Sequence, residues 1–193
     1  MLAGTKADVR KLNMLSRQAL VAAGCLHSEM TMTTEAGDRT FGVGERILFT
    51  RNNKILGVRN GQLGTMEGWR VLPGNGAMEI SVRLDGGEVI RFDPAEYSHV
   101  DHGYAISTHK AQGVTCDQVN VLLSDSMTDQ EWSYVAMSRH RQRLRVFVPE
   151  GMEEDLSLAL GRSRQKELAS DYAVATEPTS KRSSRAHEIE PAC

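Results

Sequence analysis

The fold class is decided by residues 104–149, which read YAISTHKAQGVTCDQVNVLLSDSMTDQEWSYVAMSRHRQRLRVFVP. Two runs in this stretch, YAIST and QVNVLL, have the pattern of β-strands. The run DSMTDQEWSYVAMSRH predicts a helix in which Thr128 is the N-cap and Glu131 follows three residues later. The last run, LRVFVP, is again a strand and stops at Pro149. This strand-helix-strand order predicts an α/β domain built on a parallel sheet.

A helix is also predicted near the start of the chain, over residues 6–24. Its apolar residues recur every three or four positions and form one stripe, which comprises Val9, Leu12, Leu15, Ala19, Leu20 and Ala23. Gly24 ends this helix, because glycine adopts the backbone conformation of a helix C-terminus without strain. The next segment, residues 26–38, has no sustained period and is expected to be a connector.

Residues 41–98 have a different pattern, in which short β-rich runs are separated by turn signals. The runs are RILFTR, QLGTMEGW, MEISVRL and EVIRFD, and the separators are NN, NG, PGNG and DGG. This alternation predicts a small antiparallel β-barrel. Because α/β patterns precede and follow it, we expect the barrel to be inserted in the parallel-sheet domain, which then comprises residues 1–40 and 99–150.

The C-terminal end loses this organisation. A helix is expected over residues 151–170, and residues 171–193 are expected to be a disordered tail because they contain few apolar side chains. No apolar run approaches the roughly 20 residues that cross a bilayer, and no export signal is present, so a cytoplasmic location is expected. The net charge of -2 means that any nucleic-acid contact must come from a local basic patch.

The first candidate site is the polar loop that follows the strand YAIST. Its polar residues and its glycine are Thr108, His109, Lys110, Gln112, Gly113 and Thr115. In α/β sheets, loops at the carboxyl ends of strands line the ligand crevice, where backbone amides and a lysine can meet phosphate oxygens. The loop therefore predicts a phosphate-binding site. A solvated loop that begins a helix at a threonine remains an alternative.

The second candidate site is Arg139, at the end of the predicted helix in YVAMSRHRQRLRV. An arginine is a fixed cation with five donors, and it suits the stabilisation of charge on a transferring phosphoryl group. The alternative is a solvated cationic edge that Arg139 shares with Arg141, Arg143 and Arg145.

Two further kinds of site, a metal site and an aromatic surface for base stacking, have weaker support in the sequence. His99 and His102 have no third ligand at suitable spacing, so no metal site is predicted. Trp69 and Tyr97 could stack on bases, although core positions are the simpler interpretation for Trp69 and for Trp132.

Together, STHKAQGVT and YVAMSRHRQRLRVFV resemble motifs V and VI of superfamily 1 helicases, particularly the RecD-like branch. The runs FGVGERILFTRNN, NGQLGTMEGW and VDHGYAISTHKAQG resemble the C-terminal helicase half of Ti-type conjugative relaxases of the TraA kind. The resemblance spans residues 8–149. It implies that the α/β parts form the second RecA-like motor domain of a P-loop NTPase fold, and that residues 41–98 form an inserted SH3-like barrel.

The resemblance also implies roles for single residues. Arg139 would be the arginine finger that reaches the γ-phosphate of ATP held by the first RecA-like domain. Other residues close to the nucleotide would be Gly113, Thr115 and Asp117. Single-stranded DNA would be bound by Thr108, His109, Lys110 and Gln112. The implied whole is an ATP-dependent 5′→3′ DNA helicase of conjugative-relaxase type, with ATP and Mg²⁺ as cofactors.

One departure from the family is the missing Walker A motif: none of the six lysines, at positions 6, 11, 54, 110, 166 and 181, follows a glycine. We therefore expect no ATP hydrolysis by this chain alone, and we expect it to be a piece of a larger or split protein. Two alternatives remain: a non-enzymatic module that binds single-stranded nucleic acid or protein, and an inactive remnant.

Overall fold

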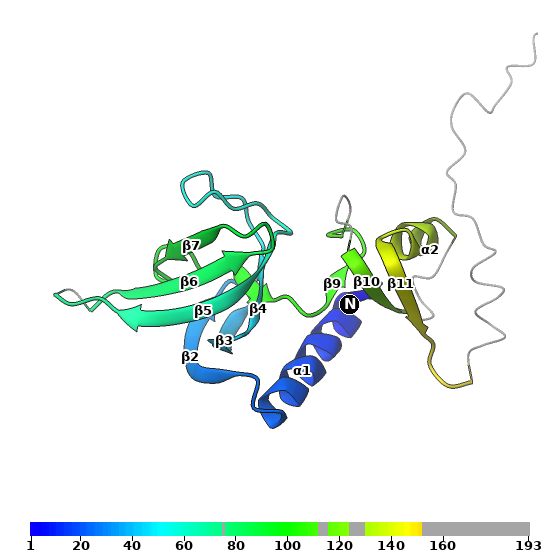
Figure 1. Cartoon of the computed structure of the whole chain (residues 1–193), viewed down its shortest axis with the longest axis horizontal. Coiled ribbons are helices and arrows are strands. Elements are labelled where there is room, and N and C mark those ends of the chain that lie inside the picture. Colours follow the sequence, from blue (N-terminus) through cyan, green and yellow to red (C-terminus); the bar gives the residue numbers. More distant parts are fainter. Residues whose placement is uncertain (75, 112–115, 124–129, 152–193) are drawn as a thin grey trace, which may run out of the picture.

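The computed structural model describes residues 1–74, 76–111, 116–123 and 130–151. Figure 1 shows an α/β unit and an all-β unit that are joined by a long helix. The elements of the α/β unit are β1 (Leu2–Ala3), α1 (Lys6–Ala22), β9 (Ile106–Ser107), β10 (Cys116–Leu122), α2 (Gln130–Met137) and β11 (His140–Phe147). Between α1 and β9 the chain forms β2 (His27–Thr34), β3 (Gly37–Val43), β4 (Arg46–Phe49), β5 (Leu63–Val71), β6 (Met78–Leu84), β7 (Val89–Phe92) and β8 (Val100–His102).

The sheet of the α/β unit is parallel throughout, in the order β11-β10-β1-β9. This confirms the parallel sheet of the predicted α/β fold. The apolar runs of the sequence supply its core, where Val121 is completely buried and Trp132 of α2 is 8% exposed. Trp132 is thus a core residue, as expected. The predicted N-cap at Thr128 and the predicted helix over residues 151–170, apart from Gly151, lie outside the described residues, as does the tail.

The all-β unit contains a five-stranded antiparallel sheet in the order β7-β6-β5-β4-β8 and the separate hairpin β2–β3. Its core includes Phe41, Phe49, Met66 and Val82, each at most 1% exposed. Within β5 the chain comes so close to β6 that a Cβ on Gly64 would lie 2.7 Å from the carbonyl oxygen of Arg83. Only glycine fits there.

The prediction of a connector over residues 26–38 is wrong, because this segment forms β2 and the start of β3. The burial pattern of β2 alternates, with Met30, Met32 and Thr34 inside. Met30 and Met32 belong to the same core cluster as the five-stranded sheet. Only Met30 and Met32 give an apolar alternation in the sequence, and threonine and methionine are weak markers of an apolar face.

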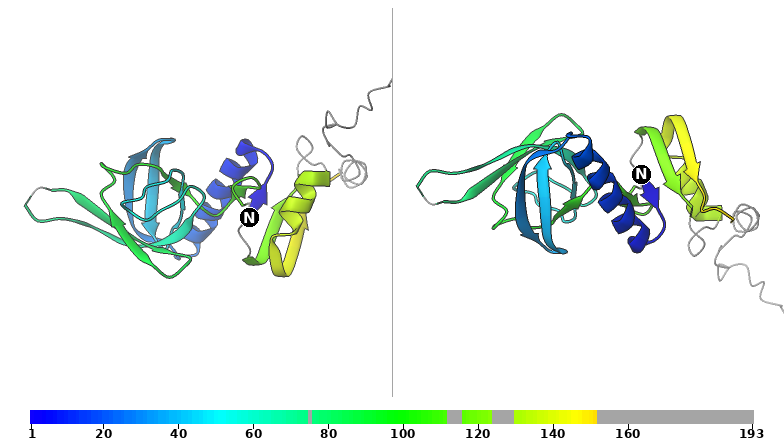
Figure 2. Two further views of the ribbon diagram at one scale, coloured as in Figure 1. Left: turned by 90° about the horizontal axis from the view of Figure 1, so that it is seen from above. Right: turned by 90° about the horizontal axis from the view of Figure 1, so that it is seen from below.

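Helix α1 forms where it was predicted. Thr5 caps it by accepting a hydrogen bond from the backbone N–H of Asp8 at 3.0 Å, and Gly24 follows its end with a φ of 68°. Its apolar stripe is largely uncovered, since Leu15 is 48% exposed and Ala19 and Ala23 are exposed as well. Both views of Figure 2 place α1 between the all-β unit and the β10–α2–β11 segment. Hydrophobic burial therefore contributes little to its position, and polar contacts hold it.

Candidate functional site

The polar loop after β9 turns sharply out of the sheet. The backbone N–H of Lys110 donates to the carbonyl oxygen of Ser107 at 2.9 Å, and Ala111 is buried in the core of the α/β unit. Thr108 is 2% exposed, and its hydroxyl has no hydrogen-bond partner among the described residues, whereas His109 and Lys110 are exposed. The loop thus presents His109 and Lys110 outward. Gln112, Gly113 and Thr115 lie outside the described residues.

Arg139 follows the last turn of α2 and folds back on it. Its Nε donates to the carbonyl oxygen of Val135 at 2.9 Å, and its Nη2 donates to the hydroxyl of Ser138 at 3.1 Å. Its carbonyl oxygen accepts from the N–H of Cys116 at 2.9 Å, which ties Arg139 to the start of β10. Within the described part of the chain, no carboxylate pairs with the guanidinium. The cation is therefore held without being neutralised.

Arg139 and the polar loop border the same small cavity of about 70 Å³. Ala111 and Cys116, which flank the undescribed part of the loop, both line it. Arg139 is thus near the buried part of the loop at Ala111, whereas Thr108, His109 and Lys110 do not line this cavity.

The other arginines of the predicted cationic edge lie elsewhere, on the exposed edge strand β11. Arg143 and Arg145 are exposed there, and Nη1 of Arg141 lies 3.8 Å from Oδ1 of Asp117. That pair is exposed on both sides and contributes little to stability. Arg139 thus differs from its neighbours by its fixed position at the helix end.

The sequence reading missed two further cations near Lys110. Lys6 and Arg10 of α1 line a groove of about 180 Å³ together with Lys110. Asp101 also lines this groove, but its Oδ1 lies 3.4 Å from the Nε of Arg39, which offsets its charge. The available signal was the spacing of Lys6 and Arg10, because residues four apart share one helix face.

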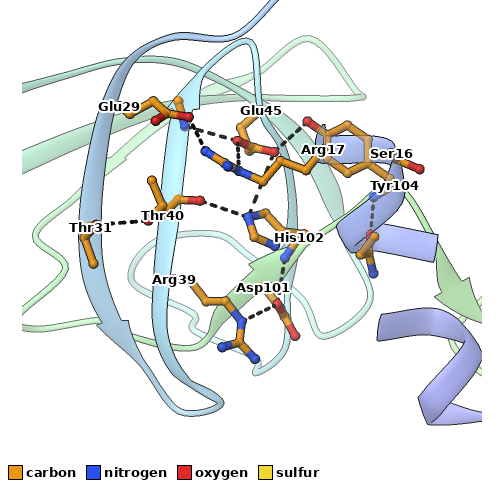
Figure 3. Close-up of polar contacts among 12 residues, drawn as sticks. Ser16, Arg17, Glu29, Thr31, Arg39, Thr40, Glu45, Asp101, His102 and Tyr104 are labelled. Carbon is orange, nitrogen blue, oxygen red and sulfur yellow. Dashed lines mark hydrogen bonds and ion pairs between the residues drawn. The ribbon is translucent and has the colours of Figure 1, made fainter. Parts of the chain in front are cut away.

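A buried carboxylate joins the two units beside this groove (Figure 3). Glu45 is completely buried, and its Oε2 accepts from the Nε of Arg17 at 3.1 Å and from the backbone N–H of Gly42 at 3.2 Å. Its Oε1 accepts from the hydroxyl of Tyr104 at 2.6 Å. Burial, and then the hydrogen bond to Glu45, raise the pKa of Tyr104 well above its usual range. Arg17 also pairs with Glu29.

Asn13 completes this junction, and it is the one residue of α1 that is buried. Its Oδ1 accepts from the backbone N–H groups of Tyr104 and Ala105, both at 2.9 Å. Its Nδ2 donates to the carbonyl oxygen of Ala105, also at 2.9 Å. The side chain therefore fixes α1 against the strand that leads into the polar loop.

The remaining candidates have structural partners. His99 Nδ1 lies 2.9 Å from Oε2 of Glu35, and His102 Nε2 lies 3.0 Å from the carbonyl oxygen of Thr40. Tyr97 is 3% exposed in the core of the all-β unit, and Trp69 packs against that core. Among the residues that the structure describes, no group of three His, Cys, Asp or Glu side chains could hold a metal ion, and no helix is long and apolar enough to cross a membrane.

Residues 86–148 match the family of the viral superfamily 1 RNA helicase core domain. The chain is 36% identical over 174 residues to the conjugal transfer protein TraA of Agrobacterium fabrum, a match that covers 89% of this chain and 16% of the relative. The probable TraA of Sinorhizobium fredii is also 36% identical, over 183 residues, with 91% and 16% covered. The chain thus spans about a sixth of the length of these relatives.

Solved structures of Pif1 helicases have a similar fold. The Candida albicans enzyme matches with a TM-score of 0.56 at 17% identity, over 84% of this chain and 47% of that one. A Bacteroides Pif1 in complex with ADP-AlF3 and single-stranded DNA matches with a TM-score of 0.53 at 22% identity, over 82% and 44%. The chain therefore belongs to the family of the TraA conjugal transfer proteins, and its residues 86–148 match a superfamily 1 helicase core.

Proposed function

We propose that this chain forms the second RecA-like domain of an ATP-dependent 5′→3′ DNA helicase of conjugative-relaxase type, with residues 41–98 as an inserted SH3-like barrel. The observation that carries the proposal is the guanidinium of Arg139. It is fixed at the end of α2, has no carboxylate partner in the described part of the chain, and borders the same cavity as the polar loop.

In this proposal Arg139 acts on ATP that is held by a partner RecA-like domain. A guanidinium that approaches the γ-phosphate stabilises the negative charge of the transition state. The hydrogen bond to the carbonyl oxygen of Val135 holds the side chain against the helix end until the partner docks. Magnesium would arrive with the nucleotide on the partner domain. Gly113, Thr115 and Asp117 remain proposed contacts of the nucleotide.

Single-stranded DNA is the proposed second ligand. The exposed side chains of His109 and Lys110 are placed to meet its phosphates, and Gln112 is proposed to join them. Thr108 is buried beneath them. We propose that it stabilises the conformation of the loop, in addition to the DNA contact predicted from the sequence. Lys6 and Arg10 extend the positive surface along α1.

A second candidate function is a non-enzymatic module that binds single-stranded nucleic acid. The groove lined by Lys6, Arg10 and Lys110 favours this function, because these cations can bind a nucleic-acid strand without any bound nucleotide. An ATPase measurement separates the two candidates.

The experiment supplies the Walker A domain of a TraA relative in trans and measures ATP hydrolysis with single-stranded DNA present. We expect the mixture to hydrolyse ATP and Arg139→Ala to lower the rate by about a thousandfold or more, as for other arginine fingers. Arg143→Ala, on the exposed edge strand, is the matched control and should leave the rate unchanged. Equal rates for Arg139→Ala and wild type would show that Arg139 is not the finger.

A further inference from the structure

The connection between β4 and β5, residues 50–62, is a strongly basic element that we call the β4–β5 loop. It reads TRNNKILGVRNGQ and contains Arg51, Lys54 and Arg59 but no acidic residue. It is drawn in cyan in Figure 1, at the edge of the all-β unit. With the described residues, the side chains of Lys54 and Arg59 form neither an ion pair nor a hydrogen bond. Two of its three cations are therefore available to an anionic partner.

The tip of this loop has a fixed shape. The Oδ1 of Asn53 accepts from the backbone N–H groups of Ile55 and Leu56 at 2.9 and 3.0 Å. Asn53 and Val58 exchange two backbone hydrogen bonds, at 2.9 and 3.0 Å. Val58 is 2% exposed and belongs to the core of the all-β unit. The loop therefore loses little further conformational entropy when it binds a partner.

This rigid tip holds Ile55 in solvent, where the side chain is 97% exposed. The exposure follows from the Asn53 turn, since the same turn directs Leu56 against the core. A branched apolar side chain between Lys54 and the basic remainder of the loop suits a partner that is anionic and also has flat apolar faces. A single strand of nucleic acid combines phosphates with exposed bases in this way.

The β4–β5 loop also lies directly beside the polar loop of the α/β unit. A Cβ on Gly61 would lie 3.3 Å from the carbonyl oxygen of Lys110, and Gly61 has a φ of 88°. Leu63, at the start of β5, packs against the core that contains Ala111. The base of the β4–β5 loop therefore lies against the backbone of Lys110.

The tip of the loop borders a groove that also contains acidic residues. Asp93 and Glu96 line a groove with Ile55 and Leu56, and Lys110 and Arg59 do not line it. The side chain of Arg51 is held by His99, whose Nε2 lies 3.1 Å from Nη1 of the arginine. Among the residues that the structure describes, the cations of this region without an ion pair are thus Lys54 and Arg59 on the loop and Lys110 next to it.

We propose that the β4–β5 loop is a second contact for single-stranded DNA, in which Ile55 packs against an unstacked base while Lys54 and Arg59 bind the flanking phosphates. This inference rests on the proposed function, because it needs a strand at Lys110. It adds a base contact to a site that otherwise touches phosphates.

The test measures binding of the full chain to a fluorescein-labelled oligothymidylate by fluorescence anisotropy at several salt concentrations. Ile55→Ala should weaken binding about threefold to tenfold, because part of an apolar side chain loses its contact, and the salt dependence should stay as in wild type. Lys54→Gln and Arg59→Gln should each lower the slope of log affinity against log salt by about 0.7. Val71→Ala, at a side chain that is 56% exposed on β5, is the matched control.

An abasic strand of the same length separates base from phosphate contacts. Wild type and Ile55→Ala should bind this strand equally. If Ile55→Ala binds the oligothymidylate as wild type does, the base contact is refuted, which is also the result expected for a tip that binds protein. If wild type binds and Lys110→Gln binds less, but all three loop variants equal wild type, only this inference fails. If wild type shows no salt-dependent binding, the proposed DNA site fails with it.

Discussion

Replacing Arg17 by methionine tests whether the buried carboxylate of Glu45 holds the two units together. The side chain of Glu45 is completely buried and that of Arg17 is 21% exposed. Methionine keeps most of the length and packing of the arginine but removes its charge. Glu45 then keeps the hydroxyl of Tyr104 and the N–H of Gly42 as donors and loses the guanidinium, while Nε2 of His102 lies 4.0 Å from its Oε1.

The expected loss can be worked from these contacts. Removing one partner of a buried ion pair destabilises a protein by about 3–5 kcal/mol when no other donor remains. Here two hydrogen bonds to the carboxylate remain, and Arg17 is partly hydrated. We therefore expect Arg17→Met to lower the free energy of unfolding by about 2–3 kcal/mol. Glu45→Gln should cost less, about 1–2 kcal/mol, because the amide oxygen still accepts and no charge is stranded.

Urea titration followed by circular dichroism measures these free energies. The loss of unfolding free energy in the double variant Arg17→Met/Glu45→Gln should be about 1 kcal/mol smaller than the sum of the two single losses, since the residues are in direct contact. Arg70→Met is the matched control, because Arg70 is 67% exposed in its pair with Glu79. That change should stay within about 0.5 kcal/mol. A loss for Arg17→Met no larger than the control's, or strict additivity in the double variant, would refute the argument.

Two other changes test the same junction. Tyr104→Phe should reduce the loss of stability above pH 10. In the wild type the raised pKa keeps the phenol of Tyr104 protonated in the folded state while it ionises in the unfolded state, so stability is lost as the pH rises. Urea titrations at pH 9 and 11 measure the difference. Asn13→Leu should lower the free energy of unfolding by about 2–4 kcal/mol in the same titration, because three backbone groups of Tyr104 and Ala105 lose their partner, whereas Gln18→Leu on the exposed side of α1 should change it by under about 0.5 kcal/mol. An unchanged alkaline slope in Tyr104→Phe, or an Asn13→Leu variant as stable as Gln18→Leu, would contradict these expectations.

The parallel sheet and strands β4 to β7 were predictable, because runs such as QVNVLL and MEISVRL alternate apolar and polar residues and are bounded by turn residues. The hairpin β2–β3 was not predicted, since its inward positions are methionine and threonine and so lack a clear apolar period. The contacts between α1 and the two units were not predictable from the sequence either. Asn13 and Glu45 read as ordinary polar residues of a helix and a turn, and their partners lie up to 92 positions away in the sequence.

The candidate site divides in the same way. Lys110 and Arg139 could be proposed from the sequence because each follows a short segment, a strand for Lys110 and a helix for Arg139, whose residue pattern predicts its structure without tertiary information. Lys6 and Arg10 were missed because their relevance depends on where α1 lies against the polar loop, which Asn13 determines through tertiary hydrogen bonds. Ile55 was missed because a single apolar residue in a turn region gives no sign of whether it faces inward.

Hydrogen bonds from α1 connect the groove cations to both units. Asn13 fixes α1 to the backbone at Tyr104 and Ala105, and Arg17, one helical turn further on, fixes the same helix to Glu45 of the all-β unit. Lys6 and Arg10 lie on the preceding turns of that helix, and Ala105 leads directly into β9 and Lys110. The three groove cations and the base of the β4–β5 loop are therefore linked by buried hydrogen bonds and close backbone contact. In the proposed function, a strand held by both loops would contact segments that these hydrogen bonds join to one another.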